Sequence, residues 1–428
     1  VKPFPIVSTR IVVLVAVVLP WLAASAVADD ALPSVHHDLQ VRLAPATHGI
    51  EVEDRVRLAR PEGAATGGIV FRLHEGLAVR SLDPAVELLR EPAVKGARPQ
   101  HPPLSTWIAR RRDASPWPAE ASLHLAYAGV IHHPPKAEGE EYARSFARTV
   151  GTIGEEGTVL TRATWWVPAF GESTLTFRLT CAVPEGWDCV SQGERTTHET
   201  KDGHRLTTWD CPHPMEEVYL IANRFHEYSR PAGKARAYAF LRDEDPNLAA
   251  RYLEATAQYL DMYGRLIGPY PFGKFALVEN FWETGYGMPS FTLLGSQVIR
   301  FPFILHSSSP HEILHNWWGN SVYVDWATGN WCEGLTAYMA DHLIQEQRGR
   351  GEEYRRGSLQ KYRNYVKEGR DFPLSEFRSR HSAATEAVGY GKALMGFHML
   401  RRKLGDDGFR EVMVRFYRAH RGKRASFE

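Results

Sequence analysis

The segment that decides the fold reads SPHEILHNWWGN and covers residues 309–320. It contains two histidines four positions apart, His311 and His315, and side chains four apart on an α-helix lie on the same face. Both imidazoles can therefore bind one metal ion. Glu312 lies about 100° around the helix, outside direct coordination but within reach of a water on that ion. The pattern predicts a helix that carries a metal site and a base.

A third ligand is predicted on a second helix, expected from about residue 330 to 347. Glu333 follows His315 after seventeen intervening residues and lies in the first turn of that helix. Three protein ligands leave one position for water, as in catalytic zinc sites, whereas a structural zinc site is closed by a fourth protein ligand. We therefore expect one Zn²⁺ ion bound by His311, His315 and Glu333, with Glu312 as the general base that takes a proton from the water.

Glu312 also fits a purely structural role. Ser309, Pro310 and Glu312 have the sequence of a capping box, with serine as N-cap, proline at the first helical position and glutamate at the third. In that case the histidines would be ordinary helix residues. The neighbouring residues are apolar nearly all round the helix, namely Ile313, Leu314, Trp317 and Trp318. A core position favours coordination, because two unpaired imidazoles would be costly there.

These motifs resemble a known family. The segment 311–320 followed by Glu333-Gly334 is similar to the aminopeptidase N and leukotriene hydrolase family of zinc metallopeptidases, which are gluzincins with H-E-x-x-H, a W-x-G-N tail and a downstream E-G. Their usual gap between the second histidine and the glutamate is eighteen residues, so the connector here is one residue shorter. The resemblance implies a multidomain protein, in which an N-terminal all-β antiparallel domain precedes an α+β, thermolysin-like and mainly helical catalytic domain.

The family also has a tyrosine in a Y-x-K-G context that stabilises the oxyanion. The segment 389–394 reads GYGKAL, with Ala393 in place of the usual glycine. The resemblance implies that Tyr390 is catalytic, because a phenol can donate a hydrogen bond to the oxygen on which negative charge develops. A tyrosine between two glycines also fits a structural role.

A third family element departs from the pattern. The family has a G-x-M-E-N strand whose glutamate binds the free amino group of the substrate. The stretch 285–291 reads GYGMPSF, with Pro289 at the glutamate and Ser290 at the asparagine. We expect an edge strand that lines the cleft, because proline is tolerated at sheet edges, with Gly287 and Met288 as substrate-binding residues. A plain turn is the alternative.

The missing carboxylate leaves amine recognition open. Glu279 and Glu283 lie upstream of the strand and are the alternatives that the sequence offers. Because Pro289 cannot bind an amine, the sequence does not separate exopeptidase from endopeptidase action, and it does not name the side-chain specificity.

The N-terminus predicts export. Residues 1–28 combine two basic residues, an apolar stretch at 11–22 and an A-x-A site at 26–28, which is typical of a secretory signal peptide. The stretch of twelve is too short to span a bilayer comfortably. We expect a periplasmic or secreted protein, with an uncleaved membrane anchor as the alternative.

In the rest of the chain, the predicted secondary structure changes once, from strands to helices. Alternating strand patterns recur from residue 35 to about 228, and helical patterns follow, so we predict a β domain over 29–232 and a zinc peptidase domain over 233–428. The last residues, 425–428, resemble the first turn of another helix, so we expect the second domain to be incomplete at its C-terminus.

Composition limits the partners. The chain has 51 basic and 50 acidic residues and a formal net charge of +1, and no basic block indicates nucleic acid. We expect a peptide or protein substrate; the oligomeric state stays open.

Among the four cysteines, Cys181 and Cys189 flank a turn at 184–187 and are the favoured disulfide, with Cys211 as another partner for either. Cys332 is expected to be a buried free thiol.

Two hypotheses follow. The first is an exported zinc-dependent metallopeptidase, in first place an aminopeptidase, that uses Glu312 and Tyr390. The second is a catalytically silent or non-aminopeptidase relative that acts as a binding module or an endopeptidase. The chemical residues are all present, whereas the shorter connector and Pro289 favour the second.

Overall fold

The computed structural model describes residues 35–59, 67–91, 104–138, 146–171, 174–367 and 369–428. The predicted signal peptide, residues 1–28, lies outside these residues. The boundary predicted after residue 232 stays a prediction.

The N-terminal part is built from open β-sheets. Their paired strands are antiparallel, as expected, except that residues 35–42 pair in parallel with residues 175–182. Alternating burial along the first two strands places one face on the core and one outside, and they pair antiparallel around a turn at Pro45–Thr47. The largest sheet has seven strands in the order β15 (Glu194–Lys201), β16 (His204–Met215), β13 (Leu175–Pro184), β1 (Val35–Ala44), β2 (Gly49–Ala59), β7 (Glu120–Val130) and β4 (Leu77–Ser81).

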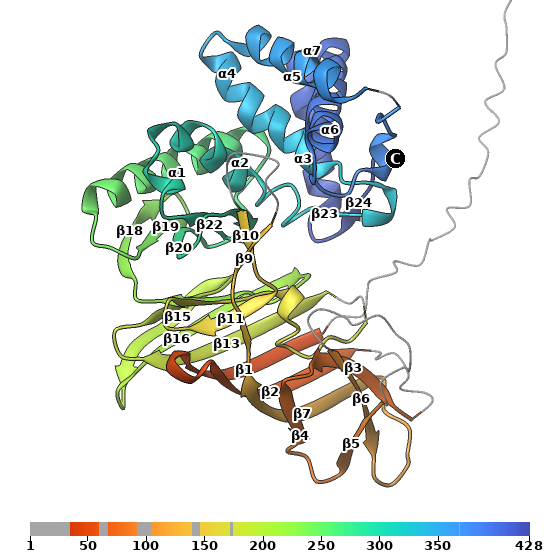
Figure 1. The fold of residues 1–428 in the computed structure, drawn as a ribbon. Helices are drawn as coiled ribbons and strands as arrows, with labels where there is room; N and C mark the ends of the chain where they lie inside the picture. The colour runs from red at the N-terminus through yellow and green to blue at the C-terminus, as the bar shows by residue number, and fades with distance from the viewer. Residues whose placement is uncertain (1–34, 60–66, 92–103, 139–145, 172–173, 368) are drawn as a thin grey trace, which may run out of the picture. The chain divides into compact units, whose positions relative to one another are not determined.

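Three smaller sheets complete this part (Figure 1). One has five strands in the order β14 (Asp188–Val190), β17 (Leu220–Asn223), β12 (Gly157–Leu160), β11 (Gly151–Gly154) and β8 (His132–His133). Another has three, β3 (Ile69–His74), β6 (Leu104–Arg111) and β5 (Val86–Arg90), and the last pairs β9 (Lys136–Glu138) with β10 (Phe146–Arg148).

The prediction of a disulfide between Cys181 and Cys189 is wrong. The turn at Pro184–Trp187 forms, and β13 and β14 on either side of it pair with β16 and β17 in different sheets. The thiols of Cys181 and Cys189 lie beside each other but form no disulfide bond. All four cysteines are buried free thiols, and Cys332 is among them, as expected.

A mixed five-stranded sheet begins the second part. Its order is β18 (His226–Ala232), β19 (Ala235–Leu241), β20 (Lys274–Asn280), β22 (Phe291–Gly295) and β21 (Gly285–Met288). Strands β19, β20 and β22 are parallel neighbours, and β21 is antiparallel to β22 at the edge. The predicted edge strand is therefore confirmed, and Pro289 lies just past its end. Figure 1 shows helices α1 (Pro246–Leu266) and α2 (Ser308–Leu314) on one face of this sheet.

The remaining chain is mainly helical. Its helices are α3 (Cys332–Thr336), α4 (Leu343–Gln347), α5 (Gly351–Tyr365), α6 (Ala383–Glu386) and α7 (Ala393–His420). A π-helical segment at Ala337–His342 joins α3 to α4, and a second one at Ala387–Lys392 joins α6 to α7. The helix predicted over 330–347 is thus present, with a π segment in its middle.

The end of the chain differs from expectation. Arg424–Ala425 forms strand β24, which pairs in parallel with β23 (Tyr323–Val324), so the described residues 425–428 are not the first turn of a helix. The backbone N–H of Asp325 donates to the carbonyl of Ala425 at 2.9 Å, and this pairing holds the segment extended.

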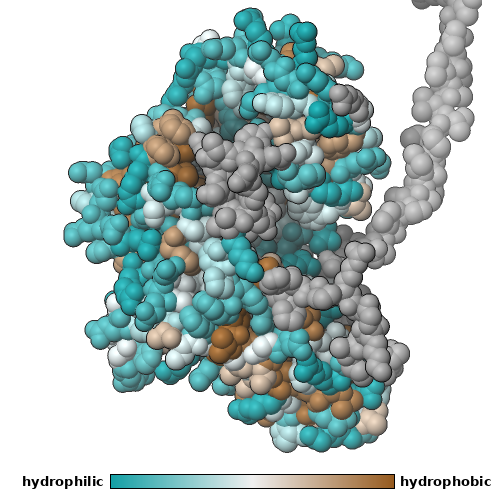
Figure 2. Space-filling model, viewed as in Figure 1, coloured by the Kyte–Doolittle hydropathy of each residue, from teal (hydrophilic) through white to brown (hydrophobic). Residues whose placement is uncertain are grey.

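Hydrophilic residues cover most of the face seen in Figure 2, with apolar residues in small groups. Within the described segments, no helix combines the length and apolar character needed to cross a bilayer.

Candidate active site

Helix α2 carries the two histidines, and its start excludes the capping-box interpretation. The helix begins at Ser308 with Ser307 as N-cap, and no side-chain cap hydrogen bond forms. Pro310 is consequently the third helical residue, and Glu312 lies past the positions that a cap would use. Ser309 and Glu312 do not form a capping box.

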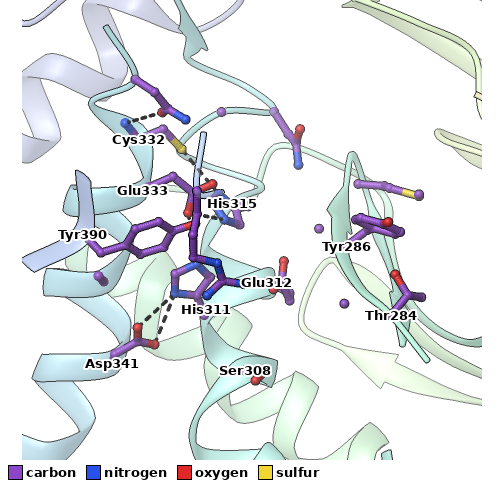
Figure 3. A pocket seen from close by; sticks show the side chains of 18 of the residues that line it. Thr284, Tyr286, Ser308, His311, Glu312, His315, Cys332, Glu333, Asp341 and Tyr390 are labelled. Carbon is purple, nitrogen blue, oxygen red and sulfur yellow. Dashed lines mark hydrogen bonds and ion pairs between the residues drawn. The ribbon is translucent and has the colours of Figure 1, made fainter. Parts of the chain in front are cut away.

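The three predicted ligands converge. The Nε2 atoms of His311 and His315 lie 3.5 Å and 3.7 Å from Oε2 of Glu333. These separations exceed a normal hydrogen bond but match two ligands on a tetrahedral zinc ion, which lie about 3.4 Å apart when each bond is about 2.1 Å. The two imidazoles and the carboxylate therefore fit a zinc ion, and Figure 3 shows their side chains turned toward one point.

Each histidine is held in its orientation by an oxygen acceptor at Nδ1. Both carboxylate oxygens of Asp341 lie 3.2 Å from Nδ1 of His311, and the carbonyl oxygen of Trp318 lies 3.2 Å from Nδ1 of His315 (Figure 3 draws the first pair). A proton held at Nδ1 leaves the Nε2 lone pair for the metal. Asp341 was missed at the sequence level. Its spacing of eight from Glu333, which returns to the same helix face, was the available signal.

Burial and neighbouring charges shift the pKa values of the two glutamates of the site in opposite directions. Burial alone would raise the pKa of Glu333, but the charges of His315 and His311 lower it to about 2. Burial raises the pKa of Glu312 above its usual range, because the neighbouring imidazoles offset only part of the desolvation. Glu333 is thus anionic, and Glu312 is the more basic carboxylate.

Glu312 reaches the edge strand. Its Oε2 lies so close to Gly287 that a Cβ on that residue would overlap with it, and the ring of His315 borders the same space. The glycine therefore lets β21 approach the helix that carries the base. Met288, the other predicted substrate-binding residue, lines the cleft but is only 4% exposed.

Tyr390 comes from the second π segment. Its ring stacks on His311 with centroids 6.3 Å apart, and its phenol hydrogen-bonds with Glu333. Burial, followed by the charge of Glu333, raises the pKa of Tyr390, so the phenol keeps its proton and stays a donor. The structure brings Tyr390 together with all three ligands and Glu312, in one cleft of about 890 Å³.

The two upstream carboxylates do not enter this cleft. Glu279 is buried and accepts from the backbone of Arg242 at 2.8 Å and from Arg300 at 2.7 Å. Glu283 accepts from the backbone N–H groups of residues 297 and 298. Both carboxylates accept hydrogen bonds from these groups, so neither replaces the amine-binding glutamate of the family, whose position is taken by Pro289.

The fold and the site together are typical of gluzincin-type zinc metallopeptidases. Residues 307–428 match the Peptidase family M1 domain. This match supports the aminopeptidase N-type gluzincin family that the motifs predicted.

The relatives are distant in sequence. The Alanine/arginine aminopeptidase of Saccharomyces cerevisiae is 24% identical over 332 residues, which are 68% of this chain and 37% of that protein. Aminopeptidase 2, mitochondrial, of the same organism is 22% identical over 72% of this chain and 35% of its own length. The chain thus spans little more than a third of the length of these curated relatives.

Solved structures agree in fold. The M1 zinc metallopeptidase from Deinococcus radiodurans has a TM-score of 0.65 at 18% identity, covering 92% of this chain and 88% of that one. A point mutant of the same bacterial protein, bound to a Tyr-ser-ala substrate, has a TM-score of 0.66 at 16% identity, with the same coverage. This likeness confirms the multidomain fold, with a β-rich N-terminal part and a helical C-terminal part.

Proposed function

We propose that the chain is an exported zinc-dependent metallopeptidase that hydrolyses peptide bonds. The observation that carries the proposal is the convergence of His311, His315 and Glu333, with Glu312 and Tyr390 bordering the same point. The family and the curated relatives, which are named as aminopeptidases, support it. Export rests on the sequence of residues 1–28 alone.

The residues divide the reaction between them. A zinc ion bound by the three ligands would polarise the scissile carbonyl and lower the pKa of its water. Glu312 would take a proton from the attacking water and deliver it to the leaving amine, a role for which its pKa, raised by burial, suits it. Tyr390 donates its phenolic proton as a hydrogen bond to the carbonyl oxygen as negative charge develops there.

The edge strand would hold the peptide backbone. Strand β21 pairs with β22 on one side only, so its other edge can accept an extended peptide by strand addition. This edge passes Glu312 at Gly287, which places the backbone of the substrate beside the base. The Tyr-ser-ala substrate of the bacterial relative supports a peptide as the ligand.

The test uses a conservative change in the base. Glu312→Gln should leave one zinc per chain, because the three ligands remain, and should lower kcat by about 10²–10⁴-fold through loss of general-base catalysis. Zinc content and hydrolysis of short peptides are measured on the purified, zinc-loaded chain. Glu353→Gln, an exposed change on α5, serves as the control. Unchanged hydrolysis by Glu312→Gln would exclude the mechanism.

The second hypothesis keeps one observation in its favour. Pro289 cannot supply a carboxylate, and Glu279 and Glu283 are occupied, so the strict amine recognition of an aminopeptidase lacks its residue on this strand. Free and N-acetylated forms of the same peptides separate the cases in the same assay. Equal cleavage of both indicates a non-aminopeptidase, and no cleavage of either by the zinc-loaded chain indicates a silent relative.

A further inference from the structure

The acidic side chains of the cleft already have partners. Among the described residues that line it, the carboxylates outside the zinc ligands and Glu312 are Glu216, Glu217, Asp341 and Glu386. Asp341 is engaged with a zinc ligand. Glu216 accepts from Arg424 at 3.1 Å. Glu217 accepts from the backbone N–H of Arg162 at 2.7 Å, and burial raises its pKa, which disfavours the charged form. These carboxylates do not offer an open anionic site to an ammonium group.

The last of these carboxylates is shared by two cations. Nζ of Lys361 lies 3.3 Å from Oε1 of Glu386, and Nη1 of Arg380 lies 3.5 Å from Oε2. The lysine and arginine side chains are 63% and 49% exposed, whereas the glutamate side chain is 26% exposed. One carboxylate cannot neutralise two cations, so this group of three residues carries a net positive charge at the cleft wall.

This charge lies beside the catalytic tyrosine. The guanidinium carbon of Arg380 is 5.7 Å from the ring centroid of Tyr390, in a cation–π arrangement, and the same ring stacks on the zinc ligand His311. Figure 3 shows Tyr390 on the opposite side of the histidines from Tyr286 of β21. A substrate that lies along β21 and extends across the zinc ligands would therefore reach the cationic group on the tyrosine side of the same cleft.

We propose that Lys361 and Arg380 form a subsite for a carboxylate of the substrate, so that this peptidase selects peptides by an anionic group close to the scissile bond. The inference rests on the proposed peptidase function and names its substrate class. Guanidinium groups bind carboxylates in a bidentate geometry, and Glu386 holds both cations in place without cancelling their charge. The terminal carboxylate of a short peptide and an acidic side chain share this chemistry.

The test compares peptides that differ by one charge. Alanine tetrapeptides with a free carboxyl end or a carboxamide end, each free or acetylated at the amino end, are cleaved by the zinc-loaded chain. We expect kcat/KM to favour the free acid about tenfold, as one charge-assisted hydrogen bond provides. A fifth peptide, amidated and carrying a glutamate in place of the last alanine, distinguishes a side-chain carboxylate from the terminal one.

The variants assign the preference to the two cations. The double change Lys361→Gln with Arg380→Gln should abolish the preference in kcat/KM for the acid over the amide. Arg363→Gln, which alters an exposed cation on the helix that carries Lys361 but outside the cleft lining, should keep this preference. The ratio is the readout, because any general effect of Arg380 on Tyr390 lowers both rates alike. A ratio near one in the unaltered chain, or a ratio unchanged by the double variant, overturns the subsite.

A second measurement separates this failure from failure of the proposed function. Binding of the fluorescently labelled acid and amide tetrapeptides to the zinc-loaded Glu312→Gln variant is followed by anisotropy, with and without the double change. Tighter binding of the acid that is lost with the two cations supports the subsite even if hydrolysis is absent. Equal binding of acid and amide contradicts the subsite even if hydrolysis is fast.

Discussion

At the scale of single residues, the site depends on side chains that are absent as well as on those that react. Gly287 leaves the space into which Glu312 and the ring of His315 fit, and its neighbour Gly285 meets only the end of Leu294. Two glycines in one short strand therefore have different reasons to be there. Only Gly287 is required for the strand to pass the base at close range.

This difference predicts the outcome of two alanine substitutions. Gly287→Ala should lower kcat/KM by about 10²-fold, because its Cβ displaces the Glu312 carboxylate and a misplacement of about 1 Å has an effect of that size. Gly285→Ala, on the same strand, should leave kcat/KM within about twofold, since its Cβ meets Leu294 at 3.7 Å. Peptide hydrolysis and circular dichroism are measured for both. Equal activity of the two variants would contradict the packing described for Glu312.

At the scale of elements, a buried lysine fixes the loop that joins β21 to β22. Lys274 of β20 donates to the hydroxyl oxygen of Ser290 at 2.8 Å and to its carbonyl at 3.2 Å, between the rings of Trp209 and Phe291. Ser290 has φ of 68°, a left-handed conformation, and its N–H donates to the side chain of Asn316 at 2.7 Å. Since Asn316 follows a zinc ligand directly, this chain of contacts sets the distance between the edge strand and the zinc helix.

The burial of Lys274 predicts a pH dependence of stability. Burial lowers its pKa from 10.5 to about 7, so the unfolded chain binds more protons than the folded one between these values, and this contribution to stability rises with pH from about 7 to 10. Below pH 7 the penalty is fully present. Relative to Lys274→Met, the unaltered chain should gain up to about 1.4 kcal/mol of unfolding free energy per pH unit in that window.

Urea unfolding at pH 6.5, 8 and 9.5 measures this difference. Lys234→Met, an exposed lysine, is the matched control and should follow the unaltered chain at every pH. Parallel pH profiles for Lys274→Met and the unaltered chain would show that the ammonium is not desolvated.

The two π-helical segments, Ala337–His342 and Ala387–Lys392, also contribute residues that border the site. Each adds a residue to a helical turn beside the site, and each contains a residue that faces the zinc ligands, Asp341 in the first and Tyr390 in the second. π-helical turns occur frequently at functional sites. Here they lie where side chains from two helices face His311.

At the scale of the molecule, strands and helices far apart in sequence meet behind the site. The phenol of Tyr323 donates to the carbonyl of Pro214, and the indole of Trp331 donates to the carbonyl of Ala425 at 2.7 Å. Arg424 joins Glu216 of the β-rich part. These contacts tie the connector between the zinc ligands to strand β24 and to the end of β16, so the position of Glu333 depends on both parts.

Zinc should therefore stabilise the folded chain as a whole. A metal that binds the folded state and not the unfolded state adds RT ln(1 + [L]/Kd), about 2.7 kcal/mol at a free concentration of 100 Kd. We expect chelation to abolish hydrolysis and to lower the Tm, and added zinc to restore both. In His315→Ala, which lacks one ligand, the Tm should respond much less to zinc. Equal zinc-dependent shifts in the two proteins would place the metal elsewhere.

The sequence by itself determined which residues make up the candidate site. The four-residue spacing of His311 and His315, the downstream Glu333 and the glycine-flanked Tyr390 are local patterns, and local helix geometry is enough to place such residues on defined faces. The strand alternation of the N-terminal part and the edge position of the strand that ends before Pro289 were predictable for the same reason, because the strand period of two and the missing proline N–H act locally.

Only the tertiary structure decided what surrounds that chemistry. Asp341 acquires its role because the chain places it beside His311, and Cys181 and Cys189 come to lie side by side from strands that join different sheets. Glu279 and Glu283 are removed from the cleft by partners distant in sequence, as Lys361 and Arg380 are brought to Glu386. Such contacts depend on how separate elements pack, which no local spacing encodes.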